Sequence, residues 1–197
     1  MGMKTKKPAT YADIEALPVG WVGELIEDAL YASPRPAFGH ARVTSVLGTE
    51  LGGPFDRGRN GPGGWWIIDE PELHLGRDIL VPDLAGWRRD RMVKPPAPSE
   101  PFVTLAPDWV CEVLSPSTAL HDRARKLAVY AREGVSHAWL IDPLLRSLEV
   151  YRREPDGWLQ RGVFGRDEVC RPEPFDALPL ELGALWLPTE TVEPAAP

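Results

Sequence analysis

The sequence predicts an α/β (α+β) domain in which helices pack on one mixed β-sheet. Short apolar runs rich in β-branched and aromatic residues alternate with two segments of helical periodicity, and turn-forming residues separate them. The expected order is a helix, several strands, a second helix and further strands, which indicates layered packing of helices on a sheet. A chain of 197 residues with 43% hydrophobic residues can bury one sizeable core.

The first third of the chain predicts a short amphipathic segment, two strands and a long helix. The amphipathic segment covers residues 11–17, and the run WVGELIEDALYASP predicts two strands that turn around Glu27 and Asp28. Residues 36–51 suit a helix because their apolar positions recur at helical spacing, and Gly52-Gly53 is expected to end it.

The middle of the chain predicts a hairpin of apolar strands, followed by a buried strand and a second helix. WWIIDEPELHL and DILVPDLAGW form the expected hairpin, whose second strand delivers Asp83, and PDWVCEVL follows as a buried strand. A hydroxyl of the SPST segment caps the next helix, which Gly134 closes. HAWLID and RSLEVYRR predict two more strands. The apolar face expected for this helix comprises Leu120, Ala124, Leu127, Ala128 and Ala131.

Composition limits the classes of protein that fit. Residues 1–9 and 189–197 are poor in bulky apolar residues and are expected to be flexible, which leaves residues 10–188 as a single domain. No apolar run is long enough to span a membrane, the basic start lacks a secretory apolar segment, and two cysteines make no disulfide framework. The expected location is therefore the cytoplasm. A net charge of −7 argues against a protein that coats nucleic acid nonspecifically but does not exclude a nuclease.

Three charged residues, Asp83, Glu112 and Lys126, predict a metal-dependent nuclease site. Both acids lie in apolar runs, where a carboxylate needs a partner or a metal ion to offset its desolvation. Mg²⁺ held by one or two carboxylates can activate a water for phosphodiester hydrolysis, and a nearby lysine can offset charge on the phosphate. The sequence does not establish that the three side chains converge.

Two basic clusters follow the candidate acids and could bind phosphates. WRRDRMVK carries Arg88 and Arg89, and HDRARK carries Arg123 together with Lys126. The alternative is that both clusters are ordinary solvated segments. His40, at the start of the first long helix, could meet a phosphate or merely cap the turn.

Each principal residue also has a structural explanation. Asp83 could be a turn residue, because Pro-Asp often opens a turn. Lys126 follows Asp122 by one helical turn, so a solvated ion pair is a serious alternative. Ser115 and Ser117 are expected to be helix caps. The tryptophans are expected in the core, and the three considered for base stacking are Trp65, Trp66 and Trp87.

In combination, these motifs resemble a known family. GELIEDALYASP, His40, VPDLAGW, PDWVCEVLSPST with the downstream Lys126, and YAREGVSHAWLIDPLLRSLEVY are similar to the Uma family, a bacterial branch of the PD-(D/E)XK nuclease superfamily described as restriction endonucleases. The resemblance extends from about Trp21 to Tyr151. It implies a restriction-endonuclease-like fold, hydrolysis of DNA with Mg²⁺ (or Mn²⁺) as cofactor, and a homodimer.

The resemblance also assigns residues. It implies that Asp83 and Glu112 bind the metal, with Glu24 as a further ligand of lower rank, and that Lys126 is catalytic. The sequence departs from the superfamily motif because Leu114 stands where the strand lysine is expected, so the lysine has moved to the next helix.

Two other classes of function stay open. A noncatalytic nucleic-acid- or protein-binding module on the same fold predicts that Lys126 points to solvent. A weaker alternative is an enzyme whose carboxylates do acid–base chemistry on a sugar, although no pair of acids with aromatic platforms indicates it.

Overall fold

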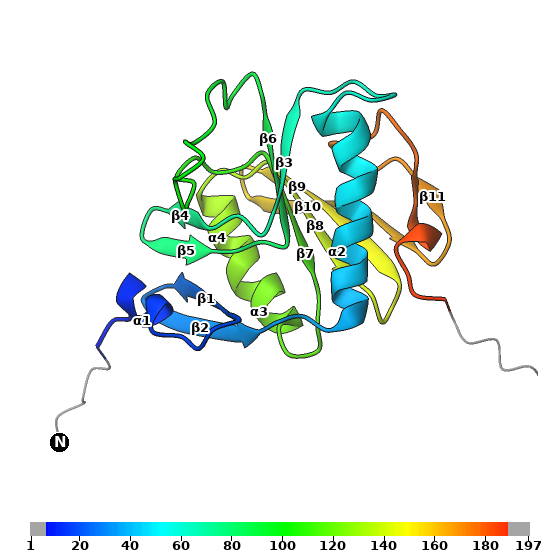
Figure 1. Cartoon of the computed structure of the whole chain (residues 1–197). Helices are drawn as coiled ribbons and strands as arrows, with labels where there is room; N and C mark the ends of the chain where they lie inside the picture. Colours follow the sequence, from blue (N-terminus) through cyan, green and yellow to red (C-terminus); the bar gives the residue numbers. More distant parts are fainter. Residues whose placement is uncertain (1–6, 189–197) are drawn as a thin grey trace, which may run out of the picture.

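The computed structural model describes residues 7–188 of the chain (Figure 1). Residues 1–6 and 189–197, which account for most of the termini expected to be flexible, lie outside the described residues. Within the expected N-terminal segment, the backbone N–H of Ala9 donates to the carbonyl of Asp28 at 2.9 Å, so the chain is already held there.

The N-terminal elements match the predicted order. The turn between the first two strands confirms the expectation for Glu27 and Asp28, which both adopt left-handed backbone conformations with φ of 52° and 63°. Two consecutive left-handed residues match the twist of an antiparallel hairpin. The elements are α1 (Tyr11–Glu15), β1 (Trp21–Ile26), β2 (Ala29–Pro34) and α2 (Phe38–Leu51).

The expectation that Gly52-Gly53 ends the long helix is wrong. Gly52 keeps right-handed helical angles, with φ −64° and ψ −35°, and its N–H still donates to the carbonyl of Gly48. The helix therefore continues as a π-helical turn, η1 (Gly52–Asp56). This turn places Phe55 in the core, where its burial offsets the poor helix propensity of glycine.

The predicted hairpin is present but is interrupted by a second one. β3 (Trp65–Asp69) pairs antiparallel with β6 (Leu84–Arg88), whereas β4 (Leu73–Leu75) and β5 (Asp78–Leu80) pair with each other and join β1 and β2 in a separate sheet. Asp83 therefore lies in the bend directly before β6 and not on a strand.

The second half of the chain supplies the centre of the main sheet. The predicted strands are confirmed as β7 (Trp109–Val113), β8 (His137–Asp142) and β9 (Ser147–Glu154). The helix after β7 comprises α3 (Ala119–His121), a π-helical turn η2 (Asp122–Lys126) and α4 (Leu127–Arg132), and Gly134 follows it with φ 87°. Not predicted were β10 (Gly157–Gly165), β11 (Val169–Cys170), β12 (Leu180–Glu181) and the 3₁₀ turn η3 (Leu182–Ala184).

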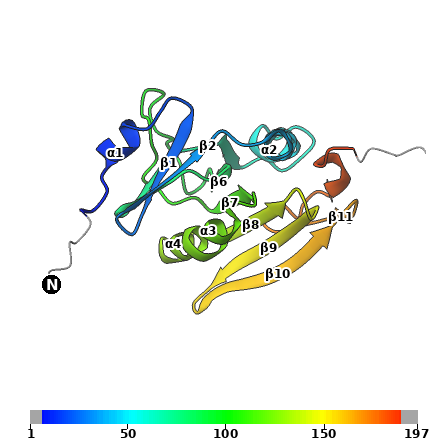
Figure 2. The same cartoon turned by 90° about the horizontal axis from the view of Figure 1, so that it is seen from below.

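The main sheet is mixed, as predicted, and has the strand order β10-β9-β8-β7-β6-β3. β7 and β8 are parallel, with the α3–α4 segment as their crossover, and the other neighbours are antiparallel. The second sheet, β2-β1-β5-β4, lies beside that helical segment, on the face of the main sheet opposite α2 (Figures 1 and 2). Two hydrophobic clusters fill the spaces on either face of the main sheet.

Successive side chains of β7 point to opposite faces of the main sheet and pack in different hydrophobic clusters. Trp109, Cys111 and Val113 pack in the cluster that contains α2 and the C-terminal segment. Val110 belongs to the other cluster, with α4 and the second sheet. Because strand side chains alternate, Glu112 points to the same side as Val110, toward α4.

Of the apolar face predicted for the helix after β7, Leu127 is buried in the core, but Leu120, Ala124 and Ala128 are not. Leu120 is 80% exposed, and Ala124 and Ala128 are exposed as well. The inward side also carries Asp122, Lys126 and Tyr130, which follow one another at intervals of four residues and are all buried. The buried side of the helix therefore combines polar contacts to β1, β7 and Val81 with the apolar packing of Leu127 and Val129.

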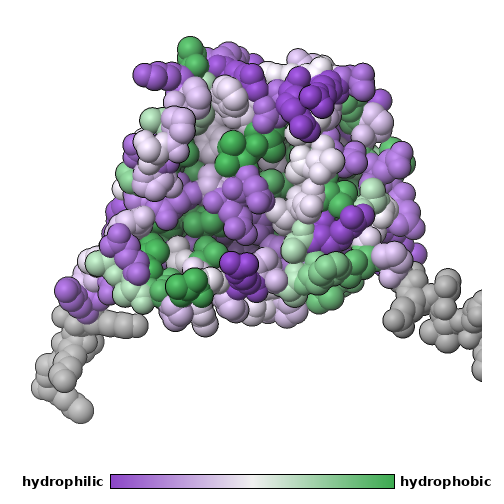
Figure 3. Space-filling view, in the orientation of Figure 1, coloured by the Kyte–Doolittle hydropathy of each residue, from purple (hydrophilic) through white to green (hydrophobic). Residues whose placement is uncertain are grey.

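The surface seen in Figure 3 mixes polar and apolar side chains without one continuous apolar band. In residues 7–188, no helix combines the length and the apolar character needed to cross a bilayer.

Candidate active site

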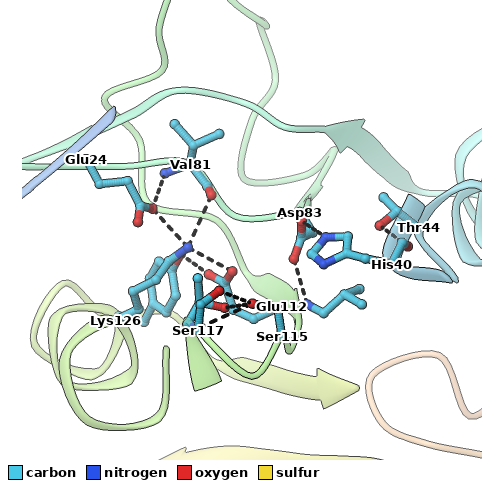
Figure 4. Close-up of polar contacts among 12 residues, drawn as sticks. Glu24, His40, Thr44, Val81, Asp83, Glu112, Ser115, Ser117 and Lys126 are labelled. Carbon is cyan, nitrogen blue, oxygen red and sulfur yellow. Dashed lines mark hydrogen bonds and ion pairs between the residues drawn. The ribbon is translucent and has the colours of Figure 1, made fainter. Parts of the chain in front are cut away.

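Asp83 is fixed at the junction of β6, β7 and α2. Its Oδ2 accepts the backbone N–H of Val113 at 2.6 Å, and its Oδ1 lies 2.6 Å from Nε2 of His40 (Figure 4). Because β6 and β7 are antiparallel neighbours, with Leu84 opposite Cys111, the residue before Leu84 falls next to the end of β7. The sheet register therefore brings Asp83 and Glu112 together.

Glu112 lies in the centre of the molecule and is 2% exposed. Its Oε2 accepts a hydrogen bond from Nζ of Lys126 at 2.8 Å, and its Oε1 accepts one from the hydroxyl of Tyr130 at 2.6 Å. Both carboxylate oxygens thus have partners on the helix after β7. Such pairing offsets the desolvation that a buried carboxylate otherwise suffers.

Lys126 is 3% exposed, and all three of its N–H donors have acceptors. Nζ lies 2.8 Å from Glu112 Oε2, 2.9 Å from Glu24 Oε1 and 3.2 Å from the carbonyl oxygen of Val81 (Figure 4). The alternative of a solvated ion pair with Asp122 does not fit this burial. A noncatalytic module on this fold predicts that the Lys126 side chain points to solvent. The burial of Lys126 does not fit that prediction either.

Glu24 joins the same cluster from β1. Its Oε1 also accepts the backbone N–H of Val81 at 2.8 Å, and Nε2 of His121 lies 3.6 Å from its Oε2. Burial by itself would raise the pKa of this carboxyl, but the charge of Lys126 and the hydrogen bonds from His121 and Val81 outweigh it and lower the pKa to about 2. Glu24 is therefore ionised near neutral pH.

The other acids of the cluster behave differently from Glu24. Burial raises the pKa of Glu112 well above its ordinary value, and neighbouring carboxylates, among them Asp122 and Asp83, add to the effect against the attraction of Lys126. Burial also raises the pKa of Asp122. For Lys126, burial would lower the pKa, but the surrounding carboxylates outweigh it and raise the pKa, so the ammonium stays charged.

These side chains face one cavity of about 440 Å³. Its walls come from β1, β2, the start of α2, the segment before β6, the end of β7 and the turn before α3. The predicted residues that line it are Glu24, His40, Asp83, Glu112 and Lys126, and it also contains Glu70, Ser115, Ser117 and Asp122. The structure thus brings the three principal residues together with the two secondary ones.

The donor set of the cavity fits a hard divalent cation held partly by water and substrate. Among residues 7–188, no group of three or more His, Cys, Asp or Glu side chains is placed so that it could hold a metal ion. Mg²⁺, however, is usually held by one or two carboxylates and keeps several waters. Asp83 and Glu112 supply such oxygens, and the five acids that line the cavity outnumber its lysine and arginine, Lys126 and Arg35.

The three arginines predicted to bind substrate do not line this cavity. Arg88 ends β6 at the side away from Asp83 and pairs with Asp90 at 2.7 Å. Arg89 donates to Asp56 at 2.7 Å and stacks over Trp66 at 3.8 Å. Arg123 makes a two-point contact with Glu149, at 2.8 and 2.6 Å.

The tryptophans considered for base stacking are packed in the protein. Trp87 is 1% exposed and donates to the carbonyl of Leu105, and Trp66 lies under Arg89 and donates to the carbonyl of Met92. Trp65 packs on Phe175, with ring centroids 4.9 Å apart. Core packing, the preferred explanation for these residues, is what the structure contains.

Sequence reasoning missed Tyr130 and did not place Asp122 in the site. The signal was present, because Asp122, Lys126 and Tyr130 repeat every four residues and so share one side of a helix. This spacing was overlooked because Leu120 and the alanines predicted that a different side of the helix faces the core. The expected helix cap is not confirmed, because the N-cap residue Thr118 makes no side-chain capping hydrogen bond. The Thr118 N–H donates to Ser115 Oγ at 3.3 Å in the turn before α3.

The cavity gathers Glu112 from the central strand β7, Asp83 from the bend before β6 and Lys126 from the helix after β7, an arrangement that fits a nuclease fold of the restriction-endonuclease type. A family described as "Uma2: Putative restriction endonuclease" matches residues 6–184. The chain belongs to this family of nucleases.

A solved structure supports the same fold. The crystal structure of "a putative nuclease belonging to DUF820" from Anabaena variabilis superposes with a TM-score of 0.72 at 23% sequence identity, and covers 90% of this chain and 97% of that one. No curated protein matches the chain.

The depressed pKa of Glu24 predicts an acid-sensitive contribution to stability. The pKa is about 2 in the folded chain against an ordinary value of 4.5, so this stabilisation is complete above pH 4.5 and is lost as the pH falls toward 2. We expect Glu24→Gln to lower the free energy of unfolding near pH 7 by up to ~3 kcal/mol and to flatten its pH dependence between pH 4.5 and 2. Urea unfolding over this range measures both effects, with the exposed Glu181→Gln as the matched control. An unchanged slope would contradict the prediction.

Proposed function

We propose that the protein is a Mg²⁺-dependent DNA endonuclease that hydrolyses phosphodiester bonds in the cavity between the two sheets. The observation that carries the proposal is the convergence of Asp83, Glu112 and Lys126 on that cavity. Membership in a nuclease family and the shared fold support it.

Each residue has a role that follows from its position. Asp83 and Glu112 would hold the metal, and Glu24 would support it through the shared lysine. A bound Mg²⁺ supplies Lewis-acid polarisation of the phosphate and lowers the pKa of an attacking water. Lys126 is permanently charged and lies beside both glutamates, so it can offset the charge that builds on the phosphate oxygens.

His40 is proposed to orient Asp83. Its Nε2 lies 2.6 Å from Asp83 Oδ1, which fixes the carboxylate against the Val113 N–H on its other oxygen. This contact explains why a histidine at the start of α2 faces the cavity.

A nicking assay on covalently closed DNA tests the proposal. Supercoiled plasmid and single-stranded circles have no ends, so their cleavage requires an endonuclease. We expect cleavage with Mg²⁺ or Mn²⁺, none with EDTA, and a loss of about 100-fold or more for Glu112→Gln. Equal cleavage by wild type and Glu112→Gln, or cleavage in EDTA, would overturn it.

The homodimer expected from the resemblance is part of the same proposal, because two sites would allow both strands of a duplex to be cut. Sedimentation of the chain with and without DNA tests the dimer separately from the chemistry.

A further inference from the structure

The cavity has the size of a pocket for a small ligand, not of a groove for a DNA duplex. Its volume is about 440 Å³, within the range of roughly 300–1,000 Å³ typical of pockets for small ligands. Glu112 and Lys126 are 2% and 3% exposed, so the reacting phosphate must enter the cavity to reach them. A phosphate held in a stacked duplex brings its neighbours and the complementary strand with it, whereas the cavity walls include residues of β2 and of the turn before α3.

An aromatic pair lines one wall of the cavity next to the acids. Tyr31 on β2 lies directly opposite Glu24 in the β1–β2 pairing, and its ring packs against His121, with centroids 4.2 Å apart and an angle of 37°. Residues opposite each other in an antiparallel pair project to the same face. Tyr31 and His121 both line the cavity, and His121 approaches Glu24 at 3.6 Å.

Polar groups for a nucleic-acid backbone complete the opening. Arg35 follows β2 and lines the cavity, and the hydroxyls of Ser115, Ser117 and Thr118 line the facing turn. A cationic path for phosphates beside an aromatic surface for bases binds single strands with little sequence preference, and Arg35 supplies the cation here.

From these observations we propose that the substrate is an unpaired DNA strand, with the base beside the scissile phosphate stacked against the Tyr31–His121 pair. Unpaired nucleotides can be extruded into a pocket at small cost because their stacking and pairing are already lost. This inference rests on the proposed nuclease function and names its substrate class. Single-stranded DNA and duplexes with gaps or bulges would then be cut faster than fully paired duplexes.

The test compares one DNA sequence in three forms: single-stranded, bulged within a duplex, and fully paired. We expect kcat/KM for the unpaired forms to exceed that for the duplex at least tenfold. Tyr31→Ala should raise KM for the single strand by about tenfold with a smaller change in kcat, whereas Tyr31→Phe keeps the ring and should match the wild type. Preferred cleavage of the paired duplex, or an unchanged KM for Tyr31→Ala, would overturn the inference.

A matched control and a second measurement test the stacking site separately from the proposed nuclease function. Tyr11 also packs against a histidine, His74, at 5.3 Å but lies outside the cavity, so Tyr11→Ala should keep wild-type KM. In EDTA, single strands carrying 2-aminopurine report stacking without cleavage. We expect fluorescence quenching on binding by the wild type and Tyr31→Phe but not by Tyr31→Ala. If no DNA form is cut, the proposed function fails, and the quenching alone then supports or overturns the stacking site.

Discussion

Replacing Lys126 with methionine is expected to lower the free energy of unfolding at pH 7 by about 3–5 kcal/mol. The methionine fills much of the lysine volume but leaves Glu24, Glu112 and Asp122 buried around no cation. Removing one partner of a buried ion pair costs this much because the remaining charges keep their desolvation penalty. Nuclease activity should fall at least 100-fold in the same variant.

The pH dependence of the free energy of unfolding tests whether unpaired buried acids destabilise Lys126→Met. Protonation removes the charge of the unpaired acids, so the stability difference between Lys126→Met and the wild type should shrink as the pH is lowered from 7 to 4. Urea unfolding at both pH values measures it, with the exposed Lys94→Met as the matched control. Adding Glu24→Gln to Lys126→Met should recover part of the loss, since it removes the ionised carboxylate that has lost its cation. A double variant that is destabilised by the full sum of the single effects would contradict the coupling.

Replacing Asp83 with asparagine is expected to reduce metal-dependent cleavage by about 100- to 1,000-fold while leaving the fold intact. The amide oxygen can still accept the Val113 N–H and the amide nitrogen can still meet His40, so the local contacts survive. What is lost is the negative charge and one hard oxygen ligand for Mg²⁺.

Three measurements separate these effects for Asp83→Asn. Thermal unfolding should stay close to that of the wild type, cleavage should fall, and the Mn²⁺ concentration for half-maximal activity should rise. The exposed Asp156→Asn in the β9–β10 turn serves as the control for loss of an aspartate. Full activity of Asp83→Asn would remove this residue from the site.

The secondary structure could be predicted wherever a segment is regular and apolar. The WVCEV strand is buried along its whole length, and the hairpin at Glu27 and Asp28 follows from a sharp polar break between two apolar runs. Prediction failed where tertiary contacts outweigh local preference. Gly52 and Gly53 continue a helix because Phe55 beyond them is buried, and β4 and β5 leave the main sheet to pair in another one.

Part of the candidate site could also be predicted from local sequence. A carboxylate within an apolar run, as at Glu112, signals an unusual environment on its own, because its desolvation must be offset. Lys126 carries no such signal, because a lysine one turn after an aspartate is usually solvated. The three arginines were predicted from local charge alone, and each pairs instead with a carboxylate of its own neighbourhood.

The sequence by itself determined the order of the elements, the central apolar strand with its embedded glutamate, and the family through motifs spread along the chain. Only the tertiary structure decided that Lys126, Glu24 and Tyr130 meet Glu112, and that Arg88, Arg89 and Arg123 stay apart from the cavity. Periodicity and burial are local properties of a chain, whereas the partner of a charge depends on strand register and helix orientation. Those are set by long-range packing of the whole domain.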